Sequence, residues 1–412
     1  MASVAIVGAG AAGMTAAIFA ARRGLKVTLI ERNVWPGRKL MITGKGRCNL
    51  TNACEIDEFM GNVPQNERFL FGALSRFSPY DTMAFFEELG VPLKVERGKR
   101  VFPVSDKAMD VVDALHLAVK ALGCHIEHGR ALQLKVKDDT VTGVVLEGGK
   151  LVSAEAVIIC TGGLSYPRTG STGDGFTFAR CAGHTVTPLR PSLVPLETVE
   201  EWAAELQGLS LRNVTVTVMD KKNGKEIYSE LGEMLFTHYG VTGPLVLSAS
   251  AHLRQMEPGR YELNIDLKPG LDETQLDKRL LRDFEKYSTR DFVNSLNELL
   301  PSKLIPVFVM LSGVNPQFKS NQITKEQRRA LVTLLKCLPL TIKGFRPIDE
   351  AVITAGGIKT SEINPVTMES KIVKNLFFAG EIIDVDAYTG GFNLQIAFST
   401  GHAAGVAALS EN

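Results

Sequence analysis

The segment GAGAAG at residues 8–13 constrains the fold of this chain more than any other feature. A short apolar run from Val4 to Val7 precedes it, and an alanine-rich segment that ends in a basic turn and Gly24 follows it. A second apolar run then closes on Glu31. The pattern predicts a buried strand, a glycine turn, a helix and a second parallel strand, which together form a βαβ unit. The chain is therefore expected to contain a dinucleotide-binding domain of the α/β class.

Each glycine of this turn has a separate physical task. Gly8 permits the tight turn, Gly10 lets a pyrophosphate approach the backbone, and Gly13 lets the helix pack closely on the strand. The start of the helix offers unpaired N–H groups and a positive dipole end to the phosphates. An acid eighteen residues after the last glycine can accept hydrogen bonds from ribose hydroxyls. The expected cofactor contacts here are Gly8, Gly10, Ala11, Ala12, Gly13 and Glu31.

The chain of 412 residues is too long for one hydrophobic core, since single cores stop growing at about 250–300 residues. Residues 214–218 and 261–267 alternate apolar and polar side chains, as half-exposed antiparallel strands do. Helical patterns follow, and the tail returns to strands and glycine turns. We therefore expect a two-ended Rossmann-type domain with a mixed domain inserted into it. The expected bounds are 1–190 and 345–412 for the first domain and 191–344 for the insert, β-rich over 191–270 and helical over 271–344.

The composition argues against several classes of protein. The 46 Lys and Arg residues nearly balance the 45 Asp and Glu residues, so no global charge favours nucleic acid or anionic membranes. No segment has the length and apolarity of a membrane span. The six cysteines form no CxxC pair, which fits a reducing compartment, and we expect a cytoplasmic protein. Cys124, His125 and His128 lie close together but lack a second ligand pair, so no metal site is expected.

A second glycine-rich region near the C-terminus decides between nicotinamide and flavin cofactors. Residues 378–381, FAGE, predict a strand that ends in a glycine and an acid, and residues 389–397, TGGFNLQIA, predict a glycine turn that opens a helix. The N–H groups at the start of that helix could face a flavin pyrimidine, where negative charge collects on reduction. This arrangement favours FAD. The expected contacts are Gly380, Glu381, Gly391, Phe392, Asn393 and Leu394.

Five stretches of the sequence resemble one known family, the BaiN-type FAD flavoproteins, which include bile-acid Δ4,6-reductases and aminoacetone-oxidase-like oxidoreductases. The stretches are GRKLMITGKGRCNLTN, TGGLSYPRTGSTGDGFTFARCAGH, LFTHYGVTGP, AVITAGGI with NPVTMESK, and FAGEIIDVDAYTGGFNLQIAFSTGHAAG. The resemblance implies bound FAD, an inserted substrate domain and redox chemistry at the flavin. It leaves the substrate open.

The segment GKGRCNLTN at residues 44–52 is one of these stretches and allows three interpretations. It is not a phosphate-binding Walker loop, because Lys45 is followed by glycine rather than Ser or Thr. It is a poor redox disulfide, because disulfide reductases with a Cys48–Cys54 type of spacing carry a second GxGxxG and this chain has none. By resemblance the loop lies along the flavin. The cofactor contacts expected in and around it are Arg38, Lys39, Gly46, Arg47, Cys48 and Asn49, and those expected elsewhere are Arg32, Ala131, Thr161, Gly162 and Gly163.

The chemistry implied by the resemblance needs a group that polarises a carbonyl oxygen and a group that delivers a proton. Tyr388 is the first candidate, because it lies between the two C-terminal glycine turns. Arg168, His238 and Tyr239 are further candidates.

Three functions remain open at this point. The first is an FAD-dependent reductase of C=C bonds in a conjugated ketone such as a 3-oxo-Δ4,6 steroid or bile-acid intermediate, with NADH or NADPH as a transient electron donor. The second is an amine oxidase, and the third is a flavoprotein that binds tRNA. The balanced charge disfavours the third, so we expect a small hydrophobic substrate and no nucleic acid. The sequence does not indicate the oligomeric state.

Overall fold

The computed structural model describes residues 2–410, which divide into two compact units. The first unit combines the two ends of the chain, up to Ser192 and from Pro347 onward. The second unit is Leu193–Arg346. A parallel sheet forms the centre of the first unit, and the predicted α/β, two-ended fold class is confirmed.

The parallel sheet brings three distant parts of the sequence side by side. Its strand order is β19-β10-β1-β2-β6, and every neighbouring pair is parallel. Val7 pairs with Ile159, and Ile159 pairs with Phe378. The carboxyl ends of β1, β10 and β19 therefore meet at the first glycine turn. The strands are β1 (Ser3–Val7), β2 (Lys26–Glu31), β6 (His125–His128), β10 (Ala156–Ile159) and β19 (Leu376–Phe378).

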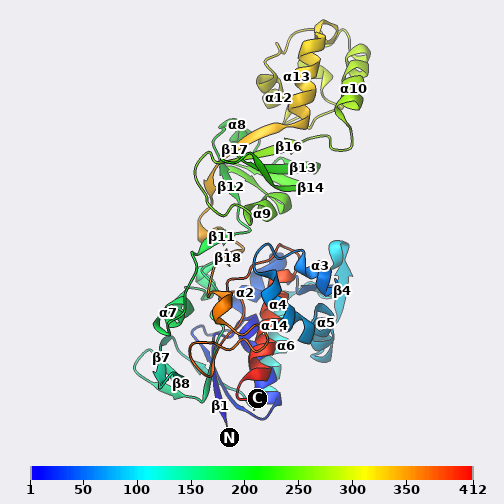
Figure 1. Ribbon diagram of the computed structural model, residues 1–412. Helices are drawn as coiled ribbons and strands as arrows, with labels where there is room; N and C mark the ends of the chain where they lie inside the picture. Colours follow the sequence, from blue (N-terminus) through cyan, green and yellow to red (C-terminus); the bar gives the residue numbers. More distant parts are fainter. Residues whose placement is uncertain (1, 411–412) are drawn as a thin grey trace. The chain divides into compact units, whose positions relative to one another are not determined.

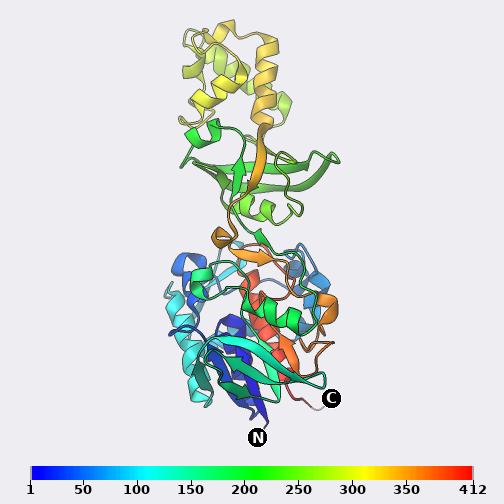
Figure 2. The same ribbon diagram turned by 90° about the vertical axis from the view of Figure 1, so that its left-hand side faces the viewer.

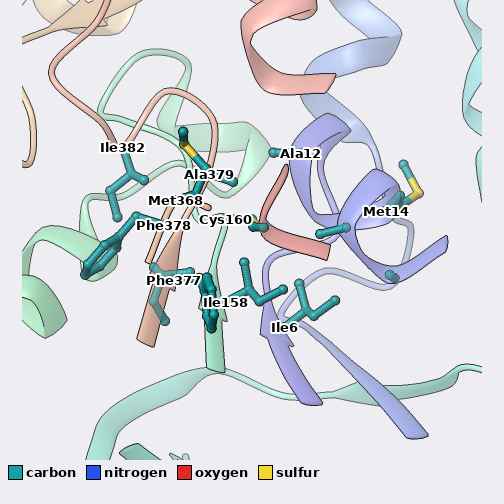
Figure 3. Packing of buried hydrophobic residues seen from close by; sticks show 14 of the residues in the cluster. Ile6, Ala12, Met14, Ile158, Cys160, Met368, Phe377, Phe378, Ala379 and Ile382 are labelled. Carbon is teal, nitrogen blue, oxygen red and sulfur yellow. The ribbon is translucent and has the colours of Figure 1, made fainter. Parts of the chain in front are cut away.

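Figure 3 shows the core beneath this edge of the sheet. Ile6, Ile158 and Phe377 extend from β1, β10 and β19 and pack against one another. Each is at most 2% exposed. Ala12 and Cys160 lie in the same cluster, next to the glycine turn. The apolar core thus supports the backbone that would carry a cofactor.

Two helices pack against each other with almost no side chain between them. They are α1 (Ala11–Arg22), which follows the first glycine turn, and α14 (Phe392–Ala407), coloured red in Figure 1. A Cβ atom on Gly401 would lie 2.4 Å from the carbonyl oxygen of Ala12, and one on Gly405 would lie 2.5 Å from that of Ala16. Real Cβ contacts are never this short, so only glycine fits these two positions. This close packing fixes the start of α14 with respect to the first turn.

Smaller elements complete the first unit. A three-stranded antiparallel sheet has the order β3-β5-β4, another has the order β7-β8-β9, and β11 pairs with β18. Their bounds are β3 (Thr51–Asn52), β4 (Leu93–Glu96), β5 (Arg100–Pro103), β7 (Ala131–Lys137), β8 (Thr140–Leu146), β9 (Leu151–Ser153), β11 (Arg190–Ser192) and β18 (Ile353–Ala355). The remaining α-helices are α2 (Arg38–Ile42), α3 (Ile56–Met60), α4 (Glu67–Arg76), α5 (Pro79–Glu88), α6 (Ala108–Ala121) and α7 (Asp174–Cys181).

The second unit is a closed antiparallel barrel with a group of helices at one end, as both ribbon views show (Figures 1 and 2). The barrel order is β12-β15-β14-β13-β16-β17. Its strands are β12 (Leu196–Thr198), β13 (Ser210–Asp220), β14 (Lys225–Thr237), β15 (Gly240–Thr242), β16 (Tyr261–Asp266) and β17 (Leu338–Phe345). Its helices are α8 (Trp202–Glu205), α9 (Pro244–Ser250), α10 (Glu273–Lys286), α11 (Phe292–Ser295), α12 (Ile305–Ser312) and α13 (Lys325–Lys336).

The end of the segment expected to be helical forms a strand instead. β17 closes the barrel by pairing with β12 and β16, so residues 338–345 belong to the sheet. The neighbouring helices begin as their sequences predict, because Asp272 and Thr324 each cap a helix in a reciprocal pair with a glutamine three residues later. Within residues 2–410, none of the helices has the length and apolarity needed to cross a membrane.

Candidate functional site

The first glycine turn separates two structural glycines from one that faces open space. Gly8 has a φ of +99°, and a Cβ atom there would lie 2.6 Å from the carbonyl oxygen of Cys160. A Cβ atom on Gly13 would lie 1.8 Å from the carbonyl oxygen of Gly8. Around Gly10, in contrast, no heavy atom lies within 4 Å of the Cβ position. The turn is therefore held together by Gly8 and Gly13, while Gly10 leaves room for a ligand against the backbone.

The N-terminus of α1 is suited to an anion. Gly10 is its N-cap residue, and no side chain caps the first turn. The first turn also contains no acidic or basic side chain, since residues 11–14 are Ala, Ala, Gly and Met. The N–H groups of Ala11 and Ala12 and the positive end of the helix dipole therefore point to the space above Gly10.

Glu31 ends β2 beside this turn and is only 7% exposed. Its Oε2 atom accepts a hydrogen bond from the Ala9 N–H at 2.8 Å. Its Oε1 atom accepts two, from the backbone N–H and from the side-chain Nδ2 of Asn33, both at 2.8 Å. A carboxylate offers about four acceptor positions, so one position remains on Oε2. The sequence prediction did not include Asn33.

The second glycine turn, at the start of α14, has the same character. Gly391 has a φ of +100°, and a Cβ atom there would lie 2.3 Å from the Thr51 carbonyl oxygen. With its amide oriented so that both ends are satisfied, Asn49 accepts from the Gly391 N–H at 3.0 Å and donates to the Thr51 carbonyl at 3.3 Å. The N-terminus of α14 carries no side-chain cap, so the N–H groups of Phe392 and Leu394 lie in an uncapped first turn.

Asn393 holds the neighbouring loop. Its Oδ1 atom accepts from the Ala387 N–H at 2.9 Å, and its Nδ2 atom donates to the carbonyl oxygens of Ala387 (2.7 Å) and Tyr388 (3.2 Å). The Tyr388 N–H in turn donates to the Asn62 carbonyl oxygen at 3.0 Å. The backbone of Tyr388, the first catalytic candidate, is thus fixed on both sides. The side chain of Asn393, expected to contact the cofactor, is engaged in this loop.

Lys39 and Glu381, both expected to contact the cofactor, lie together. Lys39 Nζ is 2.5 Å from Glu381 Oε2 and 2.7 Å from the Ser165 hydroxyl. Glu381 Oε1 accepts from Ser165 Oγ at 2.9 Å and from the Thr354 N–H at 2.9 Å. A Cβ atom on Gly163 would lie 2.4 Å from Thr354 Oγ1, so this network needs glycine there. It joins α2, the turn after β10, β18 and the end of β19.

Arg47, also expected to contact the cofactor, forms ion pairs within the protein. Its guanidinium bonds the carboxylates of Glu96 and Asp106, and lies 4.1 Å from the ring centroid of Phe102. These carboxylates raise the pKa of Arg47 and neutralise its charge locally. Lys94 completes the cluster with an ion pair to Asp106 at 2.7 Å. The cationic charge of Arg47 is therefore already balanced by Glu96 of β4 and by Asp106, which follows β5.

Other predicted contacts occupy varied positions. Gly46 has a φ of +83° and open space at its Cβ position, as Gly10 has. Gly162 has a φ of +71°, and the Thr161 hydroxyl is buried without a hydrogen-bond partner. Ala131 is buried at the start of β7, where it pairs with Leu146. Arg32 donates to the Thr172 hydroxyl at 2.6 Å and lies 3.3 Å from Asp174 Oδ2, and Arg38 donates to Asn33 Oδ1 at 3.1 Å.

The cysteines near the site are buried thiols. Cys48 is fully buried with a φ of +58°, and burial raises the pKa of its thiol to about 12. Burial also raises the pKa of Cys54 to about 11 and that of Cys160 further. A thiol with such a pKa stays protonated at neutral pH and is a weak nucleophile.

The remaining catalytic candidates lie in different places. Arg168 is exposed in the 3-10 turn Pro167–Thr169 of the first unit. His238 and Tyr239 belong to the second unit, in the turn between β14 and β15. Their rings are 4.8 Å apart, and the Arg346 guanidinium lies 4.5 Å from the Tyr239 ring centroid. Their catalytic roles stay predictions.

The residues of the first unit fit a bound dinucleotide. A flavin adenine dinucleotide would satisfy the two uncapped helix N-termini, the open backbone at Gly10 and Gly46 and the one remaining acceptor position on Glu31. Fold and site together define a flavoprotein with a two-ended Rossmann domain.

The comparisons with known proteins identify the family. The chain belongs to the family described as "HI0933-like protein Rossmann domain", whose model matches residues 2–407. It is an FAD-dependent oxidoreductase.

Two relatives with different names are equally similar in sequence. The chain is 32% identical to a 3-dehydro-bile acid delta(4,6)-reductase of Clostridium scindens, over 98% of each chain. It is also 32% identical to a ribosomal RNA dihydrouridine synthase of Escherichia coli, over 96% of this chain and 95% of that one. Among solved structures, 3-ketosteroid-delta4-(5alpha)-dehydrogenase of Rhodococcus jostii shares the fold with a TM-score of 0.50 and 16% identity, covering 100% of this chain and 97% of that one.

Proposed function

We propose that this protein reduces a carbon–carbon double bond conjugated to a carbonyl group, in a hydrophobic substrate of the 3-oxo-Δ4,6 steroid or bile-acid class. The observation that carries the proposal is the match along nearly the whole chain to the bile acid delta(4,6)-reductase. FAD, when bound, supplies hydride to the electrophilic carbon of such a substrate.

The chain's own residues then have two tasks. The uncapped N-termini of α1 and α14 bind and orient the cofactor through backbone N–H groups. Tyr388 donates a hydrogen bond or a proton from its phenol group to the substrate. Support for Tyr388 comes from its place between Gly380 and Gly390 and from the hydrogen bonds of Asn62 and Asn393 that fix its backbone. A donor on a fixed backbone loses little entropy when it meets the substrate.

The electron donor in this proposal is NADH or NADPH. The sequence has one GxGxxG motif, so the nicotinamide nucleotide would use the same cleft as the substrate, in alternation with it. If neither nucleotide reduces the bound flavin under anaerobic conditions, this part of the proposal is wrong and a protein donor takes its place.

A second candidate substrate is a uridine in ribosomal RNA. The observation that favours it is the equal identity of the chain to a ribosomal RNA dihydrouridine synthase, and a Haemophilus influenzae protein of the same name is 31% identical over 97% of this chain. The chemistry is of the same type, because dihydrouridine arises by saturation of a C=C bond conjugated to a carbonyl. The expectation that no nucleic acid takes part therefore stays a prediction with a direct test.

One anaerobic experiment separates the candidates. The flavin of the purified protein is reduced, and the return of its oxidised spectrum is followed after mixing with a 3-oxo-4,6-diene steroid or with ribosomal RNA that lacks dihydrouridine. Reoxidation by the steroid with a saturated product supports the first candidate, and reoxidation by RNA with new dihydrouridine supports the second. Reoxidation only by oxygen, with an amine such as aminoacetone as the reductant, would favour the amine oxidase instead.

A matched pair of variants tests Tyr388 in the same assay. Tyr388→Phe should slow reoxidation by the substrate about 100-fold or more, the range typical of a lost general acid. Tyr80→Phe changes an exposed tyrosine in α5 by the same atom and should leave the rate unchanged. Equal rates for both variants would remove Tyr388 from the mechanism.

A further inference from the structure

Asn33 lies at the centre of a network that joins three segments near the first glycine turn. Its side-chain Nδ2 atom donates to Glu31 Oε1 at 2.8 Å and to the Thr169 carbonyl oxygen at 3.0 Å, which uses both of its hydrogens. Its Oδ1 atom accepts from Arg38 Nη1 at 3.1 Å. All hydrogen-bonding capacity of the amide nitrogen is thus committed within the protein.

The backbone of the facing loop is shaped for this amide. Gly170 has a φ of +113°, and a Cβ atom on it would lie 2.6 Å from Asn33 Nδ2. Any other residue at position 170 would displace the amide. The segment Tyr166–Gly173 therefore depends on Asn33 for its approach to the end of β2.

The consequence for Glu31 can be counted. Asn33 fills both acceptor positions of Oε1 with its backbone and side-chain N–H groups, and Ala9 fills one position of Oε2. A carboxylate has about four acceptor positions, so the single one left on Oε2 can receive one hydroxyl hydrogen. An unrestrained glutamate could turn and accept from both hydroxyls of a ribose.

We propose that Asn33 is the positioning residue of the dinucleotide ribose site: it holds the Glu31 carboxylate so that it recognises one ribose hydroxyl, and it ties the loop Tyr166–Gly173 to that site. The inference rests on the proposed placement of the cofactor at residues 8–13. It assigns a task to a residue whose side-chain N–H groups are both used within the protein.

The test measures hydroxyl selectivity on the holoprotein. ADP, 2′-deoxy-ADP and 3′-deoxy-ADP are compared as competitors that release FAD, with flavin fluorescence as the readout. In the unchanged protein one deoxynucleotide should compete roughly 10- to 100-fold less well than ADP, as expected for one lost hydrogen bond to a charged group, and the other should match ADP. A selectivity ratio is a property of ribose recognition, and a general loss of stability would not change it.

Two variants of Asn33 address the proposal directly. Asn33→Asp keeps the shape but replaces the amide donors by a carboxylate that repels Glu31, and Asn33→Ala removes the amide without adding charge. Both should bring the ratio between the two deoxynucleotides towards 1 and weaken FAD retention. Asn315→Asp is the matched control, because its Oδ1 accepts from the Gln317 N–H and this bond survives the change.

The outcomes distinguish the inference from the proposed cofactor placement. If ADP and both deoxynucleotides compete equally well in the unchanged protein, and Glu31→Gln keeps its FAD, the ribose does not lie at Glu31. The cofactor placement and the role of Asn33 are then both wrong. If the unchanged protein discriminates and both Asn33 variants keep the same ratio, only the role of Asn33 is wrong. Equal losses for both deoxynucleotides in the unchanged protein would refute the single acceptor position.

Discussion

Gly10→Ala should separate cofactor binding from folding. Apart from Gly10 itself and its two chain neighbours, no protein atom lies within 4 Å of the Cβ position of Gly10, and its φ of −85° and ψ of −165° are allowed for alanine. Replacing glycine restricts the unfolded chain, which stabilises by about 0.4–1 kcal/mol, whereas alanine is a poorer N-cap than glycine by a similar amount. The two effects nearly cancel, so the flavin-free protein should keep its stability to within about 1 kcal/mol.

The effect on FAD should be much larger. The added methyl group occupies the space through which a phosphate reaches the N–H groups of Ala11 and Ala12. A hydrogen bond to a charged group contributes about 1.5–3 kcal/mol, so the loss of one or two such bonds should weaken binding by roughly 3 kcal/mol. That free energy corresponds to a roughly 100-fold higher Kd.

The assay compares the Kd for FAD with the unfolding temperature of the flavin-free protein. Gly13→Ala serves as the contrasting variant, because its Cβ atom would lie 1.8 Å from the Gly8 carbonyl oxygen. It should cost the fold about 3 kcal/mol or more, a drop of roughly 6–12 °C in Tm. An unchanged Kd in Gly10→Ala would refute a phosphate above this glycine, and a drop in Tm as large as that of Gly13→Ala would refute the open space around it.

Two further predictions concern titratable groups in the first unit. Iodoacetamide at pH 8 should label the exposed Cys181 first and leave Cys48 unlabelled in the native protein. The reason is that a thiol with a pKa of about 12 is only about one part in 10⁴ thiolate at that pH. Rapid labelling of Cys48 would revive a redox role for it. Burial among aromatic rings lowers the pKa of His402 to about 4, whereas the pKa of a histidine in an unfolded chain is near 6.5. Between these pH values the unfolded chain binds more protons than the folded protein does. The free energy of unfolding should therefore fall as the pH drops from 7 to 5. The titration of His402 lowers the free energy of unfolding by at most about 2 kcal/mol, and solvent screening of the partly buried ring reduces this contribution. His402→Phe, which keeps the ring stack on Phe77, should flatten the pH dependence of chemical denaturation in this window; an unchanged slope would assign it to other groups.

The parts of the fold that follow from local sequence could be predicted, and those that depend on distant partners could not. The turn at Gly8–Gly13 and the helix after Gly391 have strict local requirements, namely positive φ values and the absence of a Cβ atom. The strand β17 has no such signature: it is defined by its partners β12 and β16, which precede it by more than seventy residues in the sequence. Leu338, Leu340 and Ile342 do alternate with more exposed residues, as in a strand, but the run follows directly on a helix that ends at Lys336, and its place in the barrel was not predicted.

The same distinction explains the candidate site. A cation such as Arg47 in a glycine-rich loop suggests a phosphate contact, but its partners Glu96 and Asp106 are 49 and 59 residues away in the sequence. Asn33 likewise gives no local signal, because Thr169 is 136 residues away. Glycines in a sequence indicate where a ligand can approach, because the requirement for a positive φ or for the absence of a Cβ atom belongs to the glycine's own backbone. Charged and amide side chains acquire their roles from the residues that the fold brings to them. Substrate specificity in this protein is therefore expected to depend on such charged and amide side chains. For this reason, measurement with authentic steroid and RNA substrates decides between the two candidate functions, whose relatives are equally identical to this chain.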